Sequence, residues 1–203
     1  RGDFGPEVGT DHVNPRFIDG VGTGARVTVE AKPPQLLYLS FEALAEHVYK
    51  AGVPKERVVV VPNGINEKVI DELDKRSAER EESKDIVIGF TGFINPWHKL
   101  DKALDAIAQI GNKQIKFICV GEGDIRPDLE QQAKTLGISD QVTFTGLVNR
   151  KEVFDYVAQF DIALQPSVTE YASPLKLFEY LASGSLVIAP DMSNIREILD
   201  EKN

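Results

Sequence analysis

A lysine and a glutamate one helical turn apart are the side chains of this sequence best suited to ligand binding. Lys176 and Glu179 lie in the stretch SPLKLFEYLASG, whose apolar residues have helical spacing. Ser173 is a suitable N-cap, and Pro174 suits the first helical position, where its missing N–H costs nothing. Because a helix start attracts anions, we expect a phosphate near this start and a hydroxyl-rich group near Glu179. The alternative is an amphipathic helix with a solvated lysine and glutamate.

Helical spacing also predicts which side chains of this stretch face the core. Leu177 lies on the expected apolar face. Lys176, Glu179 and Tyr180 share the remaining stripe, since positions i, i+3 and i+4 are neighbours on a helix. The helix is expected to end at Gly184, and the segment LVIAP after it is predicted to form a short buried strand.

A regular alternation of strands and helices positions this stretch. Strands are expected at Ile86–Thr91, Gln114–Val120, Val142–Thr145, Asp161–Leu164 and Leu186–Ala189. Helices are expected at Leu100–Ile110, Pro127–Leu136, Lys151–Gln159 and Ser173–Ser183. This alternation predicts an α/β fold with a doubly wound parallel sheet. Ligands of such sheets lie beyond the carboxyl ends of the strands, so the loops there are the expected binding loops.

The chain before residue 85 predicts a smaller unit. A buried strand is expected at Gln35–Ser40, a helix at Phe41–Ala51 and a second strand at Arg57–Val61. A charged helix or linker follows over Glu67–Asp85. We place the domain boundary in this charged segment, which divides the chain into residues 1–82 and 83–203.

The composition argues against several kinds of partner. A net charge of −9 is unsuited to a nucleic-acid polymer, whose phosphates need a basic field. No apolar run approaches the roughly 20 residues of a membrane span. His12, His47 and His98 lack metal-ligand spacing, and the single cysteine, Cys119, lies in an apolar run, so no metal site is expected. Because Arg1 is not a natural start, we expect a piece of a longer protein.

The loops that follow the strands supply further candidates. After the first strand, His98 and Lys99 stand before a helix, where they could contact a phosphate. After the second strand, Gly121 and Gly123 would let the backbone approach a ligand closely. After the third strand, Val148 and its neighbours could offer backbone groups to a base edge. Surface side chains and tight turns explain these residues too, so both interpretations stay open.

Taken in order, these segments resemble the nucleotide-sugar-dependent glycosyltransferases of family four, or group 1. The similarity covers about residues 36–200 and rests on PNGIN, TGFINPWHK, FICVGEGD, VTFTGLV, DIALQPS and YASPLKLFEYLASGSLVIAP. PNGIN and SPLKLFEYLASG are its specific segments. Membership implies the GT-B architecture, in which two Rossmann-like domains face a cleft and the C-terminal domain binds the donor. It also implies a retaining transferase that needs no metal ion or cofactor.

The resemblance assigns roles to individual residues. Glu179 matches the second glutamate of the family's E-x7-E motif, which holds the donor ribose. Leu175 falls where backbone contacts the diphosphate, with Ser173 and Pro174 beside it. Lys99, or His98, matches the lysine after the first strand.

The sequence departs from the family pattern in three places. Phe93 replaces an arginine that pairs with phosphate, and Lys176 is a candidate substitute for it. Tyr171 stands where the first motif glutamate belongs, with Glu170 one position away, which puts sugar recognition in doubt. Most of the N-terminal domain and the C-terminal closing segment are missing. We therefore expect the catalytic residues to lie mostly in the missing domain and this fragment alone to be inactive.

The resemblance thus implies the donor-binding portion of a glycosyltransferase whose donor is a nucleotide-diphosphate sugar such as a UDP- or GDP-sugar. The acceptor stays open among a saccharide, a lipid-linked group and a small molecule. The expected location is cytoplasmic, with or without peripheral attachment to the inner membrane face. Two alternatives remain: a sugar-nucleotide epimerase of the same architecture, and a non-catalytic nucleotide-binding or interaction module, which Phe93 and Tyr171 favour.

Overall fold

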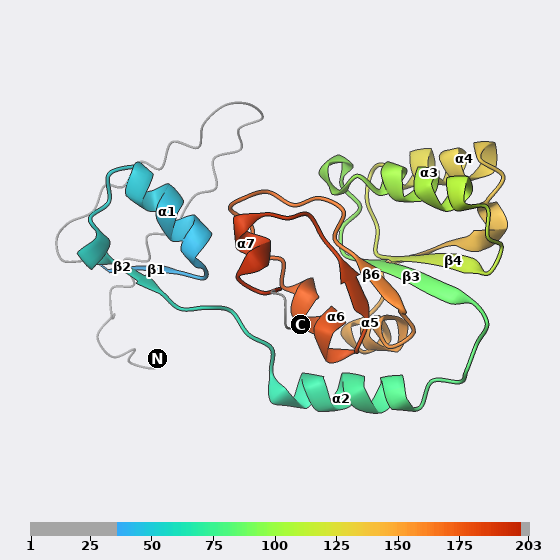
Figure 1. Ribbon diagram of the computed structural model, residues 1–203, viewed down its shortest axis with the longest axis horizontal. Helices are drawn as coiled ribbons and strands as arrows, with labels where there is room; N and C mark the ends of the chain where they lie inside the picture. The colour runs from blue at the N-terminus through green and yellow to red at the C-terminus, as the bar shows by residue number, and fades with distance from the viewer. Residues whose placement is uncertain (1–35, 200–203) are drawn as a thin grey trace, which may run out of the picture.

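The computed structural model describes residues 36–199, which form a small part and a larger part (Figure 1). The small part comprises β1 (Leu37–Leu39), α1 (Glu42–Lys50), the 3-10 turn η1 (Lys55–Arg57) and β2 (Val58–Val60). Its strands pair in parallel, which confirms the predicted strand–helix–strand order. The first strand is not buried as predicted, because Tyr38 is 66% exposed in a sheet of only two strands among the described residues. The first 35 residues of the predicted N-terminal domain lie outside the described residues.

The larger part is built on a parallel sheet with the strand order β5-β4-β3-β6-β7. Its strands are β3 (Ile86–Thr91), β4 (Ile115–Val120), β5 (Val142–Gly146), β6 (Ile162–Leu164) and β7 (Leu186–Ile188). The chain runs from β3 outward to one edge, then crosses back past β3 to the other edge. The predicted doubly wound α/β fold is therefore confirmed. Because all five strands are parallel, their carboxyl ends lie on the same side of the sheet.

Helices cover both faces of this sheet (Figure 1). One face carries α3 (Leu100–Ile110) and α4 (Arg126–Thr135), and the other carries α2 (Glu67–Ala78), α5 (Arg150–Val157) and α6 (Lys176–Ala182). The 3-10 turns η2 (Pro96–His98) and η3 (Ser139–Gln141) and the short helix α7 (Ser193–Arg196) lie in the connections. Leu73 of α2 is fully buried among the residues of α5 and α6, so the charged segment packs against the larger part. The domain boundary at residue 82 stays a prediction.

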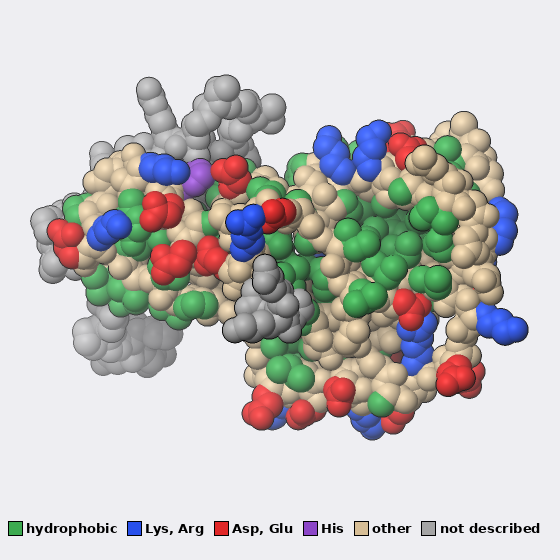
Figure 2. All heavy atoms as spheres, in the orientation of Figure 1, with side chains coloured by type: hydrophobic (Ala, Val, Ile, Leu, Met, Phe, Trp, Pro, Cys, Tyr) green, Lys and Arg blue, Asp and Glu red, His purple; other side chains and the backbone are tan. Residues whose placement is uncertain are grey.

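The last strand differs from its prediction. Leu186 and Ile188 of β7 are 72% and 56% exposed, although the segment LVIAP is predicted to be buried. The reason is position, because β7 is the edge strand of the described sheet and neither side chain joins the core under α3 and α4. Figure 2 shows hydrophobic side chains gathered on the face of the larger part that is turned to the viewer.

Polar contacts join the small part to the larger part. Glu197, just after α7, accepts hydrogen bonds from the backbone N–H groups of Glu42 and Ala43, both at 2.7 Å. It thus caps α1, whose own N-cap residue Phe41 offers no side-chain hydrogen bond. On the linker, the Asn63 side chain donates to the Ser173 hydroxyl at 2.9 Å. The predicted binding stretch therefore touches the connection between the two parts.

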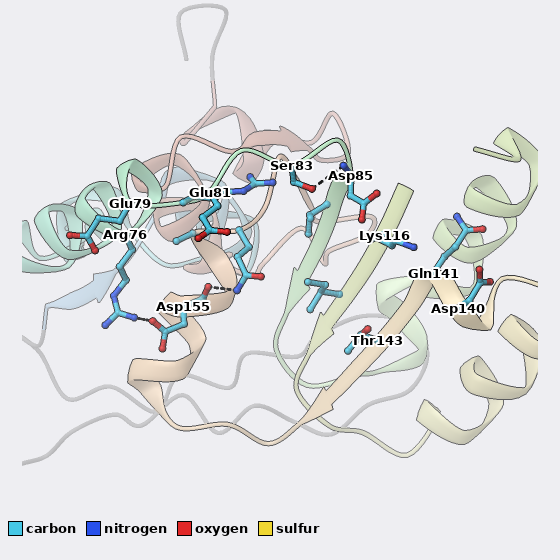
Figure 3. A pocket seen from close by; sticks show the side chains of 15 residues that line it. Arg76, Glu79, Glu81, Ser83, Asp85, Lys116, Asp140, Gln141, Thr143 and Asp155 are labelled. Carbon is cyan, nitrogen blue, oxygen red and sulfur yellow. Dashed lines mark hydrogen bonds and ion pairs between the residues drawn. The ribbon is translucent and has the colours of Figure 1, made fainter. Parts of the chain in front are cut away.

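A cavity of about 570 Å³ lies at the amino ends of the strands, on the side of the sheet away from their carboxyl ends (Figure 3). Its lining comes from the end of α2, from α5 and from residues near the amino ends of β3, β4 and β5. Figure 3 shows Arg76 turned toward Asp155, with which it forms an ion pair, and Arg80 pairs with Asp161 at 2.9 Å. These pairings give the charged lining a structural role. Since doubly wound sheets bind ligands at the carboxyl ends, we place the candidate site there despite the size of this cavity.

Candidate functional site

Tyr180 anchors α6 to the end of β3. Its side chain is fully buried, and its hydroxyl accepts a hydrogen bond from the Thr91 backbone N–H at 2.9 Å and lies 3.1 Å from the Thr91 hydroxyl. Burial raises the pKa of Tyr180. The prediction that Tyr180 lies on the polar face with Lys176 and Glu179 is therefore wrong. The Tyr180 ring can enter the core because its hydroxyl has a buried hydrogen-bond partner. This anchor holds the first turn of α6 over the carboxyl end of β3.

Lys176, the first residue of α6, lies at the centre of the candidate site. Its Nζ is 3.9 Å from the centroid of the Phe90 ring, and a β-carbon added at Gly92 would lie 3.1 Å from it. Burial lowers the pKa of Lys176 to about 8, against the raising effects of Cys119 and Glu179. None of the ion pairs found within residues 36–199 involves Lys176. A desolvated ammonium without a carboxylate partner is costly, so this position suits a bound anion.

His98 lies beside the same Phe90 ring as Lys176, whereas a ligand contact by Lys99 stays a prediction. The His98 ring lies 5.0 Å from the Phe90 ring, edge to face, and its Nδ1 accepts a hydrogen bond from the Asn95 backbone N–H at 3.4 Å. Burial, and then the charge of Lys176, lowers the pKa of His98 to about 4. A backbone hydrogen bond with Phe93 raises this pKa only in part, so His98 is neutral near neutral pH. Lys99 is exposed, with a left-handed backbone at φ 57°, and is the N-cap residue of α3.

Glu179 lies one turn after Lys176 and is held by an arginine. Its Oε1 is 2.6 Å from Nη2 of Arg150, the first residue of α5. The Glu179 side chain is only 12% exposed, whereas the Arg150 side chain is 69% exposed. Arg150 is not among the residues predicted from the sequence, since nothing in the spacing of the two helices indicates that they meet. Glu170, the other candidate glutamate, is exposed in the turn before α6.

The three residues before α6 form a turn instead of its first helical turn. The helix begins at Lys176, so Ser173 is not its N-cap and Pro174 is not its first residue. The Ser173 hydroxyl is instead engaged by the linker residue Asn63, while the Leu175 N–H donates to the Ser173 carbonyl at 2.9 Å. Pro174 is buried, and the Leu175 side chain is 55% exposed. Because α6 has only seven residues, the positive charge at this site is mainly that of Lys176.

The glycines after β4 have a packing reason. A β-carbon on Gly121 would lie 2.1 Å from the Gly92 carbonyl oxygen, and one on Gly123 would lie 2.1 Å from the Ile94 carbonyl oxygen. The loop after β4 therefore fixes the loop after β3, which carries Gly92 and His98. Val148, after β5, is half-buried against the core that contains Tyr180. A ligand contact by Gly121, Gly123 or Val148 stays a prediction.

A smaller cavity of about 210 Å³ lies where the two parts meet. Its lining includes Ser40 after β1, Asn63 of the linker, and Ser173 and Phe178 of the candidate stretch. The buried Asn194 side chain also lines it, and no partner for Asn194 Oδ1 is found among residues 36–199. The segment from Ser173 to Phe178 thus contacts both the loop after β3 and the cavity between the two parts. No group of three or more metal-binding side chains occurs in the described part of the chain.

Known proteins match both the sequence and this fold. Residues 85–203 match the family described as glycosyl transferases group 1. The chain belongs to the group 1 glycosyltransferases. This glycosyltransferase chain is 22% identical over 193 residues to an alpha-D-kanosaminyltransferase of Streptomyces kanamyceticus, covering 92% of the chain and 50% of that relative. It is 31% identical over 103 residues to a 2-deoxystreptamine glucosyltransferase of the same organism, covering 50% of the chain and 26% of the relative.

The structural comparison gives the same architecture. The glycosyltransferase chain superposes on Anabaena HepE in complex with UDP with a TM-score of 0.70 and 21% identity, covering 82% of the chain and 48% of HepE. The predicted GT-B fold is therefore confirmed. The chain spans about half the length, or less, of these relatives. Within residues 36–199, no helix is long and apolar enough to cross a membrane.

Proposed function

We propose that this chain is the donor-binding portion of an enzyme that transfers a sugar from a nucleoside-diphosphate sugar to an acceptor. The observation that carries the proposal is the Lys176 ammonium, which is desolvated against Phe90 and Gly92 at the carboxyl end of β3. A diphosphate would supply the anionic partner that this lysine lacks within residues 36–199. The group 1 match does not favour the epimerase or the non-catalytic module.

Different residues of the site contact the diphosphate, the ribose and the base of the nucleotide. Lys176 pairs with the diphosphate, and the neutral His98 donates an N–H to a phosphate oxygen. Glu179, one turn further along α6, accepts hydrogen bonds from the ribose hydroxyls. Backbone groups near Val148 contact the base. Because the superposed HepE is in complex with UDP, this is the first nucleotide to test.

The chemistry follows from this arrangement. Departure of the nucleoside diphosphate builds negative charge on the leaving phosphate, and Lys176 stabilises that charge without a metal ion. We expect retention of the anomeric configuration, as the family resemblance implies. The catalytic side chains and the acceptor contacts belong mostly to the facing domain, and the acceptor is a saccharide, a lipid-linked group or a small molecule. We place the protein in the cytoplasm, free or at the inner membrane face.

Calorimetric titration with UDP and GDP tests the proposal. Lys176→Ala should weaken the affinity for the preferred nucleotide about tenfold to a hundredfold, because a hydrogen bond to a charged group contributes roughly 1.5–3 kcal/mol. The control is Lys102→Ala, which removes an exposed lysine of α3. This control should leave the dissociation constant within about twofold, since exposed ion pairs contribute little. Equal affinities of the two variants would remove Lys176 from the site and with it the basis of the proposal.

A further inference from the structure

We propose that Arg150 is a positioning residue for the ribose of the bound nucleotide. It holds one oxygen of the Glu179 carboxylate, so that the second oxygen faces the ribose hydroxyls. The inference rests on the proposed function, because it needs a nucleotide whose ribose reaches Glu179. It adds a residue of α5 to a site otherwise built from α6 and the strand-end loops.

The start of α5 gives Arg150 a fixed origin. Asn149 caps this helix: its side-chain oxygen accepts hydrogen bonds from the N–H groups of Lys151 and Glu152, both at 3.0 Å. In return, the Glu152 carboxylate accepts from the Asn149 N–H at 2.8 Å. This reciprocal capping box orders the backbone on both sides of Arg150. The guanidinium is therefore presented from an ordered helix start.

A second contact fixes the guanidinium itself. Its central carbon lies 5.0 Å from the centroid of the Phe154 ring, one turn further along α5. A guanidinium stacked on an aromatic face loses fewer orientations than one free in water. From this position Nη2 reaches Glu179 Oε1 at 2.6 Å. Two independent contacts, with Phe154 and with Glu179, thus define the orientation of an otherwise exposed side chain.

The unequal exposure of the pair gives the direction of the effect. Glu179 is nearly buried, and a buried carboxylate is stable only with hydrogen-bond donors or a charge partner. An ionised carboxylate has two oxygens with about four acceptor sites. Arg150 occupies part of one oxygen, which leaves acceptor sites for two neighbouring hydroxyls. Without Arg150, the carboxylate is free to turn toward solvent or toward other donors, and the ribose loses an ordered acceptor.

The experiment compares UDP with 2′,3′-dideoxy-UDP, using calorimetric titration of the full 203-residue chain. Arg150→Ala should weaken UDP binding about fivefold to tenfold, because a disordered acceptor loses part of what a hydrogen bond to a charged group contributes. It should change dideoxy-UDP binding by less than about twofold, because that ligand has no hydroxyl for Glu179 to accept. Arg150→Lys should recover part of the loss. Glu179→Ala combined with Arg150→Ala should bind UDP as weakly as Glu179→Ala alone.

Lys151→Ala is the matched control, since it removes one positive charge from the adjacent position of α5. Lys151 is exposed, and only its backbone N–H contacts the cap, so this variant should bind both ligands as the unaltered chain does. Equal weakening of both ligands by Arg150→Ala would show a general charge or folding effect and overturn the positioning role. Tighter UDP binding by Arg150→Ala would show that Arg150 obstructs the site, which also overturns it. If the unaltered chain did not distinguish the two ligands, the ribose contact of the proposed function would fail first.

Discussion

The chemical character of Lys176 is set by its surroundings. The Phe90 ring is 3.9 Å from its ammonium, and burial lowers its pKa to about 8. In water a lysine is charged at every physiological pH, but here the charge depends on pH near neutrality. A bound diphosphate would favour the charged form and raise this pKa again. The affinity for a nucleoside diphosphate should therefore report the protonation of Lys176.

We predict that UDP binding weakens as the pH rises above about 8. Below the pKa of the free chain, Lys176 is already protonated, so binding requires no proton and affinity is constant. Above that pKa, binding must take up a proton, and affinity falls by up to about tenfold per pH unit until the pKa of the bound state is reached. Calorimetry between about pH 7.5 and 9.5 measures this while the UDP phosphate stays ionised. Lys176→Arg should give a flat profile, and a flat profile for the unaltered chain would contradict the assignment.

The two candidate glutamates should differ in the same measurement. Glu179 is nearly buried and follows Lys176 by one helical turn, whereas Glu170 is exposed in the turn before α6. We predict that Glu179→Ala weakens UDP binding by about 1.5–3 kcal/mol, the cost of leaving a hydroxyl without its charged acceptor. Glu170→Ala should cost less than about 0.5 kcal/mol, as is usual for surface changes. Equal affinities of the two variants would remove the ribose contact from Glu179.

Backbone packing between loops, at the scale of elements, makes the site rigid. Gly123 leaves no room for a side chain, because a β-carbon there would lie 2.1 Å from the Ile94 carbonyl oxygen. We predict that Gly123→Ala lowers the free energy of unfolding by about 1–3 kcal/mol, the usual cost of overpacking. The control is Gly64→Ala in the linker, where nothing lies within 4 Å of the added carbon. Urea unfolding of both variants measures the difference. Equal midpoints would show that the loop after β4 can shift to accommodate the added β-carbon.

Periodicity predicts the elements of the larger part well, and tertiary contacts decide what it misses. The strand at Ile86–Thr91 and the helix at Leu100–Ile110 have the predicted bounds, since a buried parallel strand and an amphipathic helix both leave strong local patterns. The predicted start of α6 is wrong because the hydroxyl of Ser173, a good N-cap by type, hydrogen-bonds Asn63, 110 residues away in sequence. Burial of Tyr180 likewise depends on Thr91, which no local pattern reveals.

The candidate site is predicted in part. The types and positions of Lys176, Glu179 and His98 are enough to select them, and the structure brings Lys176 and His98 to the Phe90 ring. Arg150 is missed, since its ion pair with Glu179 joins α5 and α6 across the fold. Lys99 is predicted as a phosphate contact and is the exposed N-cap residue of α3, so its contact stays a prediction. Spacing therefore finds the groups within one element, and only the fold shows which elements meet.

At the scale of the whole molecule, we expect positively charged side chains, and not a metal ion, to balance the charge of the diphosphate. No group of three or more metal-binding side chains occurs in residues 36–199, and Lys176 already lies at the carboxyl end of β3. We predict that the dissociation constant for UDP is unchanged by EDTA within about twofold. Parallel titrations with EDTA and with added magnesium measure this. A weakening of more than about tenfold on chelation, near 1.4 kcal/mol, would contradict metal-free binding.

Our last prediction concerns what this chain does on its own. The larger part carries Glu179 and the group formed by Lys176, His98 and the Phe90 ring, whereas the described small part is a two-stranded sheet with one helix. The group 1 relatives named above are about twice as long or longer, so we expect the acceptor contacts to come from protein beyond this chain. Holding donor and acceptor in a reactive geometry contributes roughly 7–11 kcal/mol to such a reaction. We therefore expect the chain to bind a nucleoside diphosphate and to transfer no sugar.

The test pairs two measurements on one sample. Calorimetry with UDP, GDP and ADP should detect binding, and assays of donor hydrolysis and of transfer should detect no turnover above background. Steady transfer to any acceptor by this chain would show that the active site lies within it and that the facing domain is dispensable. Loss of the binding signal in Lys176→Ala would tie that signal to the carboxyl end of β3. Absence of binding to all three nucleotides would instead count against the proposed donor site and favour a non-catalytic interaction module.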